Sequence, residues 1–185
     1  MTTLPYSNTA MLVIDAQNVI LKDCYQRDQK VSKISKAIDY CRRNQTPVLW
    51  IQHSDSDITQ GSAEWEIVPE LKPSPGESLV NKHYRSSFVD TNLHETLQNM
   101  QVGHLIIAGA ESNNCIRHTI HSALDLGYDV TLLGDAHTAV SFEWDGLAVD
   151  AERVIDEQNL NFMNYQLPGR SVKVVKVADL KLEVK

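Results

Sequence analysis

Three residues that could do chemistry together stand where apolar segments of this chain end. Asp15 closes the segment 11–15, Lys82 closes 78–82, and Cys115 follows the segment 104–110 after a short polar stretch. A cysteine nucleophile needs a base to take its proton, and no histidine closes the stretch before Cys115, so Asp15 is the base in the best position. Lys82 would then stabilise the thiolate and the charge that develops on a substrate.

Each of these residues also has an ordinary structural interpretation. Asp15 could form a turn or cap a helix, Lys82 could be a solvated lysine, and Cys115 could be a small buried apolar residue. We interpret Cys41 as such a buried residue, because it falls on the apolar side of a predicted helix, while Cys24 lies in a polar segment and stays open. Cys115 differs because a helix is predicted to begin beside it, and a helix N-terminus lowers the pKa of a thiol and offers N–H groups to an oxyanion.

The elements that must position these side chains alternate between strand and helix. Buried apolar runs predict strands at 11–15, 48–52, 78–82, 104–110, 129–136 and 171–177, and apolar residues at helical spacing predict helices at 29–44, 92–100, 115–128 and 146–165. This alternation predicts an α/β fold, an open, doubly wound, mainly parallel sheet in a three-layer α/β/α sandwich of the Rossmann-like kind. Ligands bind such sheets at the carboxyl ends of the strands, where all three candidate residues stand.

Length and composition limit the possible classes of protein. The 185 residues suit one domain, 1–185, and the net charge of −7 argues against nucleic acid or an anionic membrane surface as a partner. No apolar run approaches the ~20 residues that cross a bilayer, and the first residues lack a secretory signal, so we expect a cytoplasmic protein. The three cysteines form no CxxC pair, which gives no indication of a zinc site or a redox dithiol.

Four segments carry a resemblance to a known family. The segments LVIDAQN (12–18), VNKHYRSSFVDTNLHETL (80–97), LIIAGAESNNCIRHTIHSALDLGYDV (105–130) and GDAHTA (134–139) resemble the isochorismatase-like cysteine hydrolases, which include nicotinamidases and N-carbamoylsarcosine amidase. The resemblance implies a six-stranded parallel sheet and a catalytic triad of Asp15, Lys82 and Cys115. It also implies a cis peptide bond between Ala110 and Glu111, and an oxyanion hole made by the backbone N–H groups of Glu111 and Cys115.

The resemblance further implies an enzyme that hydrolyses a small-molecule C–N bond, in an amide, ureide or lactam, through a thioester. Metal-dependent nicotinamidases carry an Asp-Trp-His triplet where this chain has QHSDSD (52–57), so we expect no metal and no cofactor. His53 and Asp55 could still contact a metal, and a metal-assisted nicotinamidase or isochorismatase-type hydrolase stays an alternative. A non-catalytic binding or scaffold protein with the same fold is the other.

The pocket is expected between the segment after the first strand and the segments 55–76 and 83–90. The candidate substrate-binding residues in these segments are Gln17, Asn18, Trp65, Tyr84 and Phe88. Trp65 could equally anchor its own loop. The resemblance also implies association into a homo-oligomer, a dimer or tetramer, in which a neighbouring copy could help to close the pocket.

Overall fold

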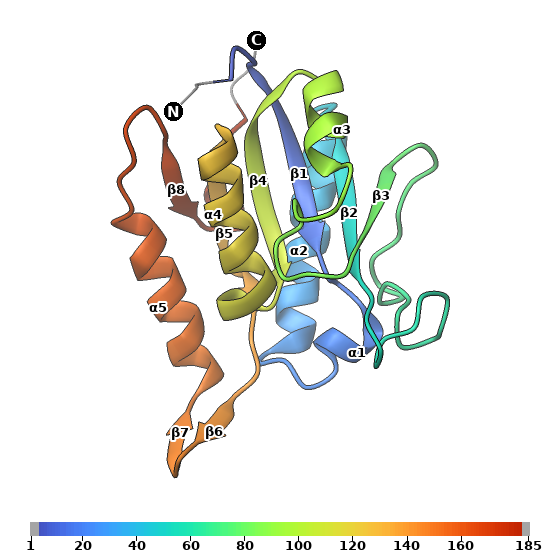
Figure 1. The fold of residues 1–185 in the computed structure, drawn as a ribbon, viewed down its shortest axis with the longest axis vertical. Coiled ribbons are helices and arrows are strands. Elements are labelled where there is room, and N and C mark those ends of the chain that lie inside the picture. The colour runs from blue at the N-terminus through green and yellow to red at the C-terminus, as the bar shows by residue number, and fades with distance from the viewer. Residues whose placement is uncertain (1–3, 183–185) are drawn as a thin grey trace.

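A six-stranded parallel sheet forms the centre of the protein in a computed structural model, which describes residues 4–182 (Figure 1). The strands lie in the order β3-β2-β1-β4-β5-β8, and every neighbouring pair is parallel. Their bounds are β1 (Asn8–Ile14), β2 (Val48–His53), β3 (Ser78–Lys82), β4 (Val102–Ala110), β5 (Asp129–Thr138) and β8 (Val172–Val175). The order reverses between β1 and β4, and such a switch point opens a crevice at the carboxyl ends of the strands.

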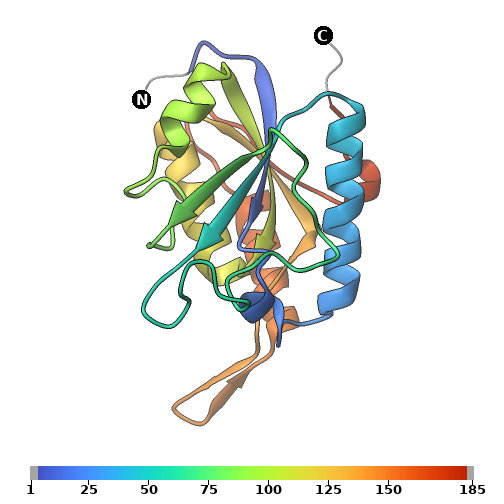
Figure 2. The same cartoon turned by 90° about the vertical axis from the view of Figure 1, so that its right-hand side faces the viewer.

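Helices cover both faces of this sheet. The helix α2 (Arg27–Arg43) lies on one face, and α3 (Leu93–Asn99), α4 (Arg117–Leu126) and α5 (Ala151–Met163) lie on the other, as Figures 1 and 2 show. The expected doubly wound α/β/α sandwich is therefore confirmed. No helix among residues 4–182 is both long and apolar enough to span a membrane.

The strands are apolar along their whole length because both faces of the sheet are covered. In β1, Met11 and Val13 belong to the core cluster that includes α2, whereas Leu12 and Ile14 belong to the cluster on the opposite face. All four side chains are fully buried. This alternation is the period of two that a strand dictates, with an apolar layer on either side.

The predicted helix 146–165 is wrong at its start. Residues before α5 form a hairpin of two antiparallel strands, β6 (Phe142–Trp144) and β7 (Leu147–Val149). Asp145 and Gly146 connect them with φ values of 49° and 75°, and two successive positive φ values make the type I′ turn that an Asp-Gly pair favours. The Asp-Gly pair between the segments 142–144 and 147–149 was thus a hairpin signal.

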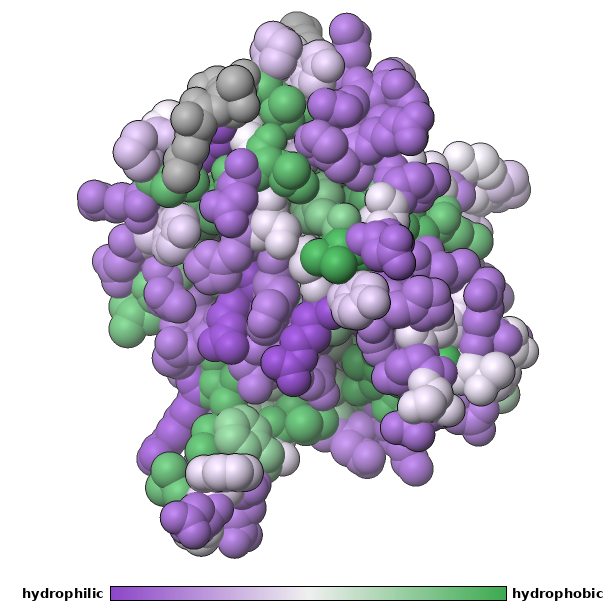
Figure 3. All heavy atoms as spheres, in the orientation of Figure 1, coloured by the Kyte–Doolittle hydropathy of each residue, from purple (hydrophilic) through white to green (hydrophobic). Residues whose placement is uncertain are grey.

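This hairpin projects away from the body of the protein and carries exposed apolar side chains. Trp144 is 76% exposed and Leu147 64%, and apolar surface gathers on the projecting arm in Figure 3. Association of copies through this or another surface stays a prediction.

The segment around Cys115 also differs from the single helix that its spacing predicts. A short helical turn, η1 (Ser112–Ile116), precedes α4, and Asn114 within it has the non-helical angles φ −114° and ψ −106°. Cys115 therefore lies in the turn between β4 and α4.

Gly109 provides a test of how closely the carboxyl ends of β1 and β4 approach each other. Its φ is +124°, and a Cβ atom there would lie 1.9 Å from the carbonyl oxygen of Ile14. We expect Gly109→Ala to lower the free energy of unfolding by about 3 kcal/mol or more, from backbone strain and overpacking together. Chemical denaturation measures this change.

Gly61→Ala is the matched control, because Gly61 has a φ of +86° but no atom within 4 Å of the added Cβ. Backbone strain alone should lower the free energy of unfolding of Gly61→Ala by about 1–2 kcal/mol. Equal losses in the two variants would show that the contact with Ile14 is unimportant.

Candidate active site

The carboxyl ends of three strands bring Asp15, Lys82 and Cys115 together. The Lys82 Nζ lies 2.7 Å from Oδ2 of Asp15 and 3.3 Å from Sγ of Cys115. Asp15 directly follows β1 with a positive φ of 49°, Lys82 is the last residue of β3, and Cys115 lies in the turn after β4. Side chains separated by up to a hundred positions in sequence thus meet because parallel strands end at one edge of the sheet.

Lys82 contacts three other side chains through its ammonium group. It reaches from β3 past β2, where His53 is its register partner, to Asp15 after β1. Besides Asp15 and Cys115, its Nζ lies 3.4 Å from Nδ1 of His53. An ammonium group has three donors, so these three acceptors account for all of them. Both Lys82 and Asp15 are fully buried, and a buried charge needs such pairing.

The contact with Lys82 also fixes the orientation of His53. Because Lys82 can only donate, Nδ1 of His53 accepts, and Nε2–H is then free to donate to Oδ2 of Asp55 at 3.0 Å. The other oxygen of Asp55 accepts the backbone N–H groups of Asp57 and Ile58. His53 therefore links the loop after β2 to the floor of the site.

Burial controls the electrostatics of the acid and the thiol. It raises the pKa of Asp15 above its usual value, while the charge of Lys82 opposes this most strongly and a hydrogen bond with the Cys115 thiol opposes it further. Burial, followed by the negative charge of Asp15, raises the pKa of Cys115 to about 12. The lowered thiol pKa expected at a helix N-terminus is therefore not found, because burial and Asp15 outweigh it. With its pKa raised in this way, the Cys115 thiol is neutral near neutral pH.

The other two cysteines have no such partners. Cys41 lies on the buried face of α2 and is fully buried in the core, and Cys24 is 6% exposed with its Sγ donating to the carbonyl of Ile20 at 3.1 Å. Burial raises the pKa of each thiol to about 12. Both are small core residues, whereas Cys115 borders a cavity.

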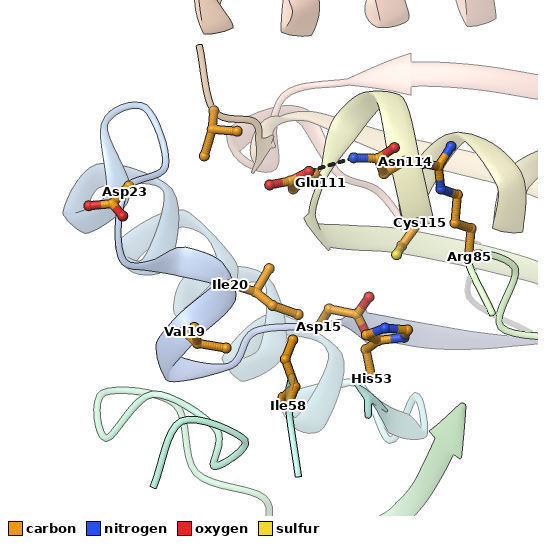
Figure 4. A pocket seen from close by; sticks show the side chains of 11 residues that line it. Asp15, Val19, Ile20, Asp23, His53, Ile58, Arg85, Glu111, Asn114 and Cys115 are labelled. Atoms are coloured by element: carbon orange, nitrogen blue, oxygen red, sulfur yellow. Dashed lines mark hydrogen bonds between the residues drawn. The ribbon is translucent and has the colours of Figure 1, made fainter. Parts of the chain in front are cut away.

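That cavity has a volume of about 300 Å³ and lies over Cys115 (Figure 4). Its walls are in part aliphatic, and its polar lining has acidic, basic and amide groups. The aliphatic residues are Val19, Ile20, Ile58 and Val140, and the polar ones beside Asp15 and Cys115 are Asp23, His53, Arg85, Glu111 and Asn114. A cavity of this size is at the lower end of ligand-binding pockets and suits a small molecule.

The turn before Cys115 contributes one wall of the cavity. The peptide bond between Ala110 and Glu111 is cis. The side chain of Glu111 accepts a hydrogen bond of 2.6 Å from Nδ2 of Asn114, and Figure 4 shows both side chains beside Cys115.

Two of the expected substrate-binding residues hold loops in place. Gln17 is fully buried, and its amide bonds the backbone N–H and carbonyl of His53 and the carbonyl of Trp65. Asn18 donates to the carbonyl of Ala63 at 2.8 Å. These bonds fasten the 62–68 segment to the end of β1, so both residues shape the cavity from behind and do not line it.

The other three candidates also lie outside the cavity lining. Phe88 stacks on Tyr128 with ring centroids 5.7 Å apart, and Tyr84 is 54% exposed. Trp65 is half-buried in its loop, in line with the anchoring interpretation. Substrate binding by these residues stays a prediction, and it would require their side chains to move.

Eight of the residues that line the cavity were not named from the sequence as substrate-binding, although the segments expected around the pocket included Ile58 and Arg85. They are Val19, Ile20, Asp23, His53, Ile58, Arg85, Asn114 and Val140. The position of His53 could have been predicted from the sequence, because it is the last residue of β2 and pairs with Lys82, the last residue of β3. The aliphatic residues come from the short helix α1 (Asn18–Leu21) and from loops, where spacing carries no periodic signal. Among residues 4–182, no group of three or more His, Cys, Asp or Glu is placed to hold a metal ion, so His53 and Asp55 stand as a pair.

Comparison with known proteins identifies the family. The sequence model of the isochorismatase domain matches residues 9–156, which include Asp15, Lys82 and Cys115. The chain belongs to the isochorismatase-like hydrolase family.

Several relatives cover most of the chain. The uncharacterised isochorismatase family protein YddQ of Bacillus subtilis is 30% identical over 159 residues, which are 79% of this chain and 86% of YddQ. The "Probable inactive nicotinamidase" of Arabidopsis thaliana is 28% identical over 182 residues, 84% of this chain and 90% of its own. The ureidoacrylate amidohydrolase RutB of Agrobacterium fabrum is 26% identical over 176 residues, 72% of this chain and 77% of its own. The relatives thus include amidohydrolases.

Solved structures show the same fold. The crystal structure of an isochorismatase from Pseudomonas putida superposes with a TM-score of 0.85 at 24% identity, covering 98% of this chain and all of the other. The six-stranded parallel sheet with flanking helices is therefore the fold of the family.

Proposed function

We propose that this protein is a cysteine-dependent hydrolase that cleaves a C–N bond of a small amide, ureide or lactam through a thioester. The observation that carries the proposal is the position of Lys82, whose ammonium contacts both the Asp15 carboxylate and the Cys115 sulfur at the floor of the cavity. An acid-base group, a nucleophile and a fixed positive charge thus converge on one place that a small ligand can reach.

In the first half of the reaction, Asp15 takes the proton of the Cys115 thiol as sulfur attacks the carbonyl carbon. Lys82 stabilises the negative charge on sulfur, and the N–H groups of Glu111 and Cys115 stabilise the oxyanion of the tetrahedral intermediate. The C–N bond then breaks, and Asp15 gives its proton to the leaving nitrogen. The products of this half are an amine and an acyl thioester on Cys115, and with a lactam the amine stays attached to the acyl group.

In the second half, a water molecule replaces the amine. Asp15 takes a proton from the water while the oxygen of that water attacks the thioester carbon. The same N–H groups stabilise the new oxyanion. The C–S bond breaks, the acid leaves, and Asp15 returns the proton to the sulfur. Burial suits Asp15 to both steps, because a raised pKa makes a carboxylate a better base.

The test is a panel of small amides, ureides, lactams and nicotinamide, with and without added divalent metal ions. Hydrolysis of a C–N substrate without metal, with a transient acyl adduct on Cys115 in the intact-protein mass spectrum, is the expected result. Turnover of nicotinamide that depends on added metal would favour the metal-assisted alternative, for which the His53–Asp55 pair is the supporting observation. No turnover and no adduct would favour a non-catalytic protein, as the name of the Arabidopsis relative suggests for that protein.

Alkylation provides a test that needs no substrate. Near neutral pH, iodoacetamide should label Cys115 well before Cys24 and Cys41, as measured by mass spectrometry of peptides. The three thiols have similarly raised pKa values, but Cys115 borders the cavity and has Asp15 to take its proton. Labelling of Cys24 at the same rate as Cys115 would argue against an activated nucleophile.

A further inference from the structure

A chain of buried polar side chains lies behind the turn that carries Cys115. Oγ of Ser112 is 2.7 Å from Nδ1 of His137, and Nε2 of His137 is 2.9 Å from Oδ1 of Asn159. These residues come from η1, β5 and α5, and both Ser112 and His137 are fully buried. Neither belongs to the lining of the cavity, so a substrate cannot reach this serine.

The hydrogen-bond pattern assigns a direction to the chain. Nδ2 of Asn159 donates to the carbonyl of Gly134 at 3.1 Å, so its Oδ1 faces His137 as an acceptor. Nε2 of His137 therefore carries the hydrogen, and Nδ1 is left as an acceptor for the Ser112 hydroxyl. That hydroxyl also lies 2.9 Å from the carbonyl of Thr138, so its one proton faces two acceptors on β5.

His137 is suited to remain a neutral acceptor. Its complete burial lowers its pKa to about 4, a change that nearby Lys30 favours and that Asn159 and Asp135 oppose. The ring therefore keeps one hydrogen across the neutral pH range, and its bond to Ser112 does not titrate there.

The position of Ser112 in the chain gives this bond its consequence. Ser112 directly follows Glu111 and stands three residues before Cys115, and the backbone carbonyl of Glu111 accepts the N–H groups of Asn114 and Ile116. Fixing Ser112 from behind thus fixes the turn on which the two proposed oxyanion donors stand. Donor geometry matters strongly, since removing one oxyanion donor lowers kcat by about 10²–10³-fold in a serine protease.

We propose that His137 is a positioning residue, which acts through Ser112 to hold the turn 111–115 so that the N–H groups of Glu111 and Cys115 point at the same oxyanion. The inference rests on the proposed function for its role in hydrolysis. It concerns the orientation of the turn, and it is tested on the turn itself as well as on turnover.

The variants are Ser112→Ala, His137→Phe and the double variant, with Ser112→Thr as the conservative one that keeps the hydroxyl. We expect Ser112→Ala and His137→Phe each to lower kcat by about 10- to 100-fold with KM within about twofold, and Ser112→Thr to recover most of the loss. The double variant should be no slower than the slower single one, because both changes break the same bond. Additive losses, or a change in KM alone, would overturn the inference.

Ser87→Ala is the matched control for a merely structural effect. Ser87 is fully buried and its Oγ lies 2.9 Å from Oγ1 of Thr119, but it does not line the cavity. Its loss should lower the free energy of unfolding and leave kcat unchanged. A fall in kcat equal to that of Ser112→Ala would show that any buried hydroxyl has this effect.

A second readout separates this inference from the proposed function. Propanal adds to a thiol to give a thiohemiacetal, whose oxygen lies where the oxyanion would form, and its binding is measured by protection of Cys115 from iodoacetamide. Ser112→Ala and His137→Phe should weaken protection by propanal about tenfold while the alkylation rate without aldehyde changes by less than about twofold. Equal protection in all variants overturns the inference, whatever the enzyme hydrolyses. Weakened protection without turnover of any amide would support the inference and count against the proposed function.

Discussion

Replacing Lys82 with methionine is expected to lower amide hydrolysis by at least about 10³-fold. The change removes the ammonium group that contacts both the Asp15 carboxylate and the Cys115 sulfur, and with it the proposed stabilisation of the thiolate. Steady-state kcat and KM measure the effect, and the loss should be mainly in kcat, because Lys82 lies beneath the cavity. Activity within tenfold of the wild type would remove Lys82 from the mechanism.

The same substitution should also widen the pH range over which stability falls as pH rises. Asp15 loses the charge that most strongly holds down its already raised pKa, so its pKa rises further. The folded variant then binds a proton that the unfolded chain releases near pH 4, so its stability is greatest in acid and falls as pH rises through the raised pKa. Breaking a buried ion pair costs about 3–5 kcal/mol, and protonation of Asp15 offsets part of this at low pH.

Lys33→Met is the control, because it breaks an ion pair of similar length on the surface. Nζ of Lys33 lies 2.9 Å from Oδ2 of Asp135, with the lysine side chain 40% exposed. Such a pair contributes at most about 1 kcal/mol, so denaturation at several pH values should separate the two variants clearly. A loss of stability in Lys82→Met that does not change with pH would contradict the raised pKa expected for Asp15 in this variant.

Replacing Cys115 with alanine should lower kcat/KM by about 10⁴-fold or more against any C–N substrate found in the panel. The sulfur is the atom that forms the thioester, so the variant should show neither burst nor acyl adduct. Small residual activity would come from the oxyanion donors and binding alone. Equal hydrolysis by the wild type and the variant would end the nucleophile proposal.

Cys41→Ala is the matched control for this change. It removes a thiol with the same raised pKa from a fully buried position in the core. It should lower the free energy of unfolding through the cavity it leaves and keep kcat intact. A loss of activity there would point to a general packing effect.

The sequence predicted the fold well because the chain signals it in simple ways. Strands buried on both faces read as continuous apolar runs, and the predicted segment 78–82 coincides with β3. The residues that meet at the sheet edge were predictable for the same reason, because Asp15 and Lys82 stand at strand ends whose relative position the topology fixes.

Features outside the regular strands were less predictable. The spacing of apolar residues in 146–165 favoured one helix, although the turn at Asp145 and Gly146 makes the first part a hairpin. Gln17 looked like a pocket residue because it is polar and near Asp15, but its amide is used to bind the backbone of two loops. Which way a side chain points after a strand ends depends on contacts from distant loops, and local sequence does not encode them.

The pairing of β1 with β4 has a consequence for how the protein forms. Thr9 pairs with His104 in the register of these two central strands, 95 positions along the chain. Closing such a long loop costs conformational entropy before the contacts between the two strands form and stabilise the pairing. Chains rich in such distant pairings therefore fold slowly. Because Asp15 follows β1 and Cys115 follows β4, a chain that lacks its second half cannot bring these two side chains together. During refolding, activity should therefore return no earlier than the native far-UV circular dichroism signal.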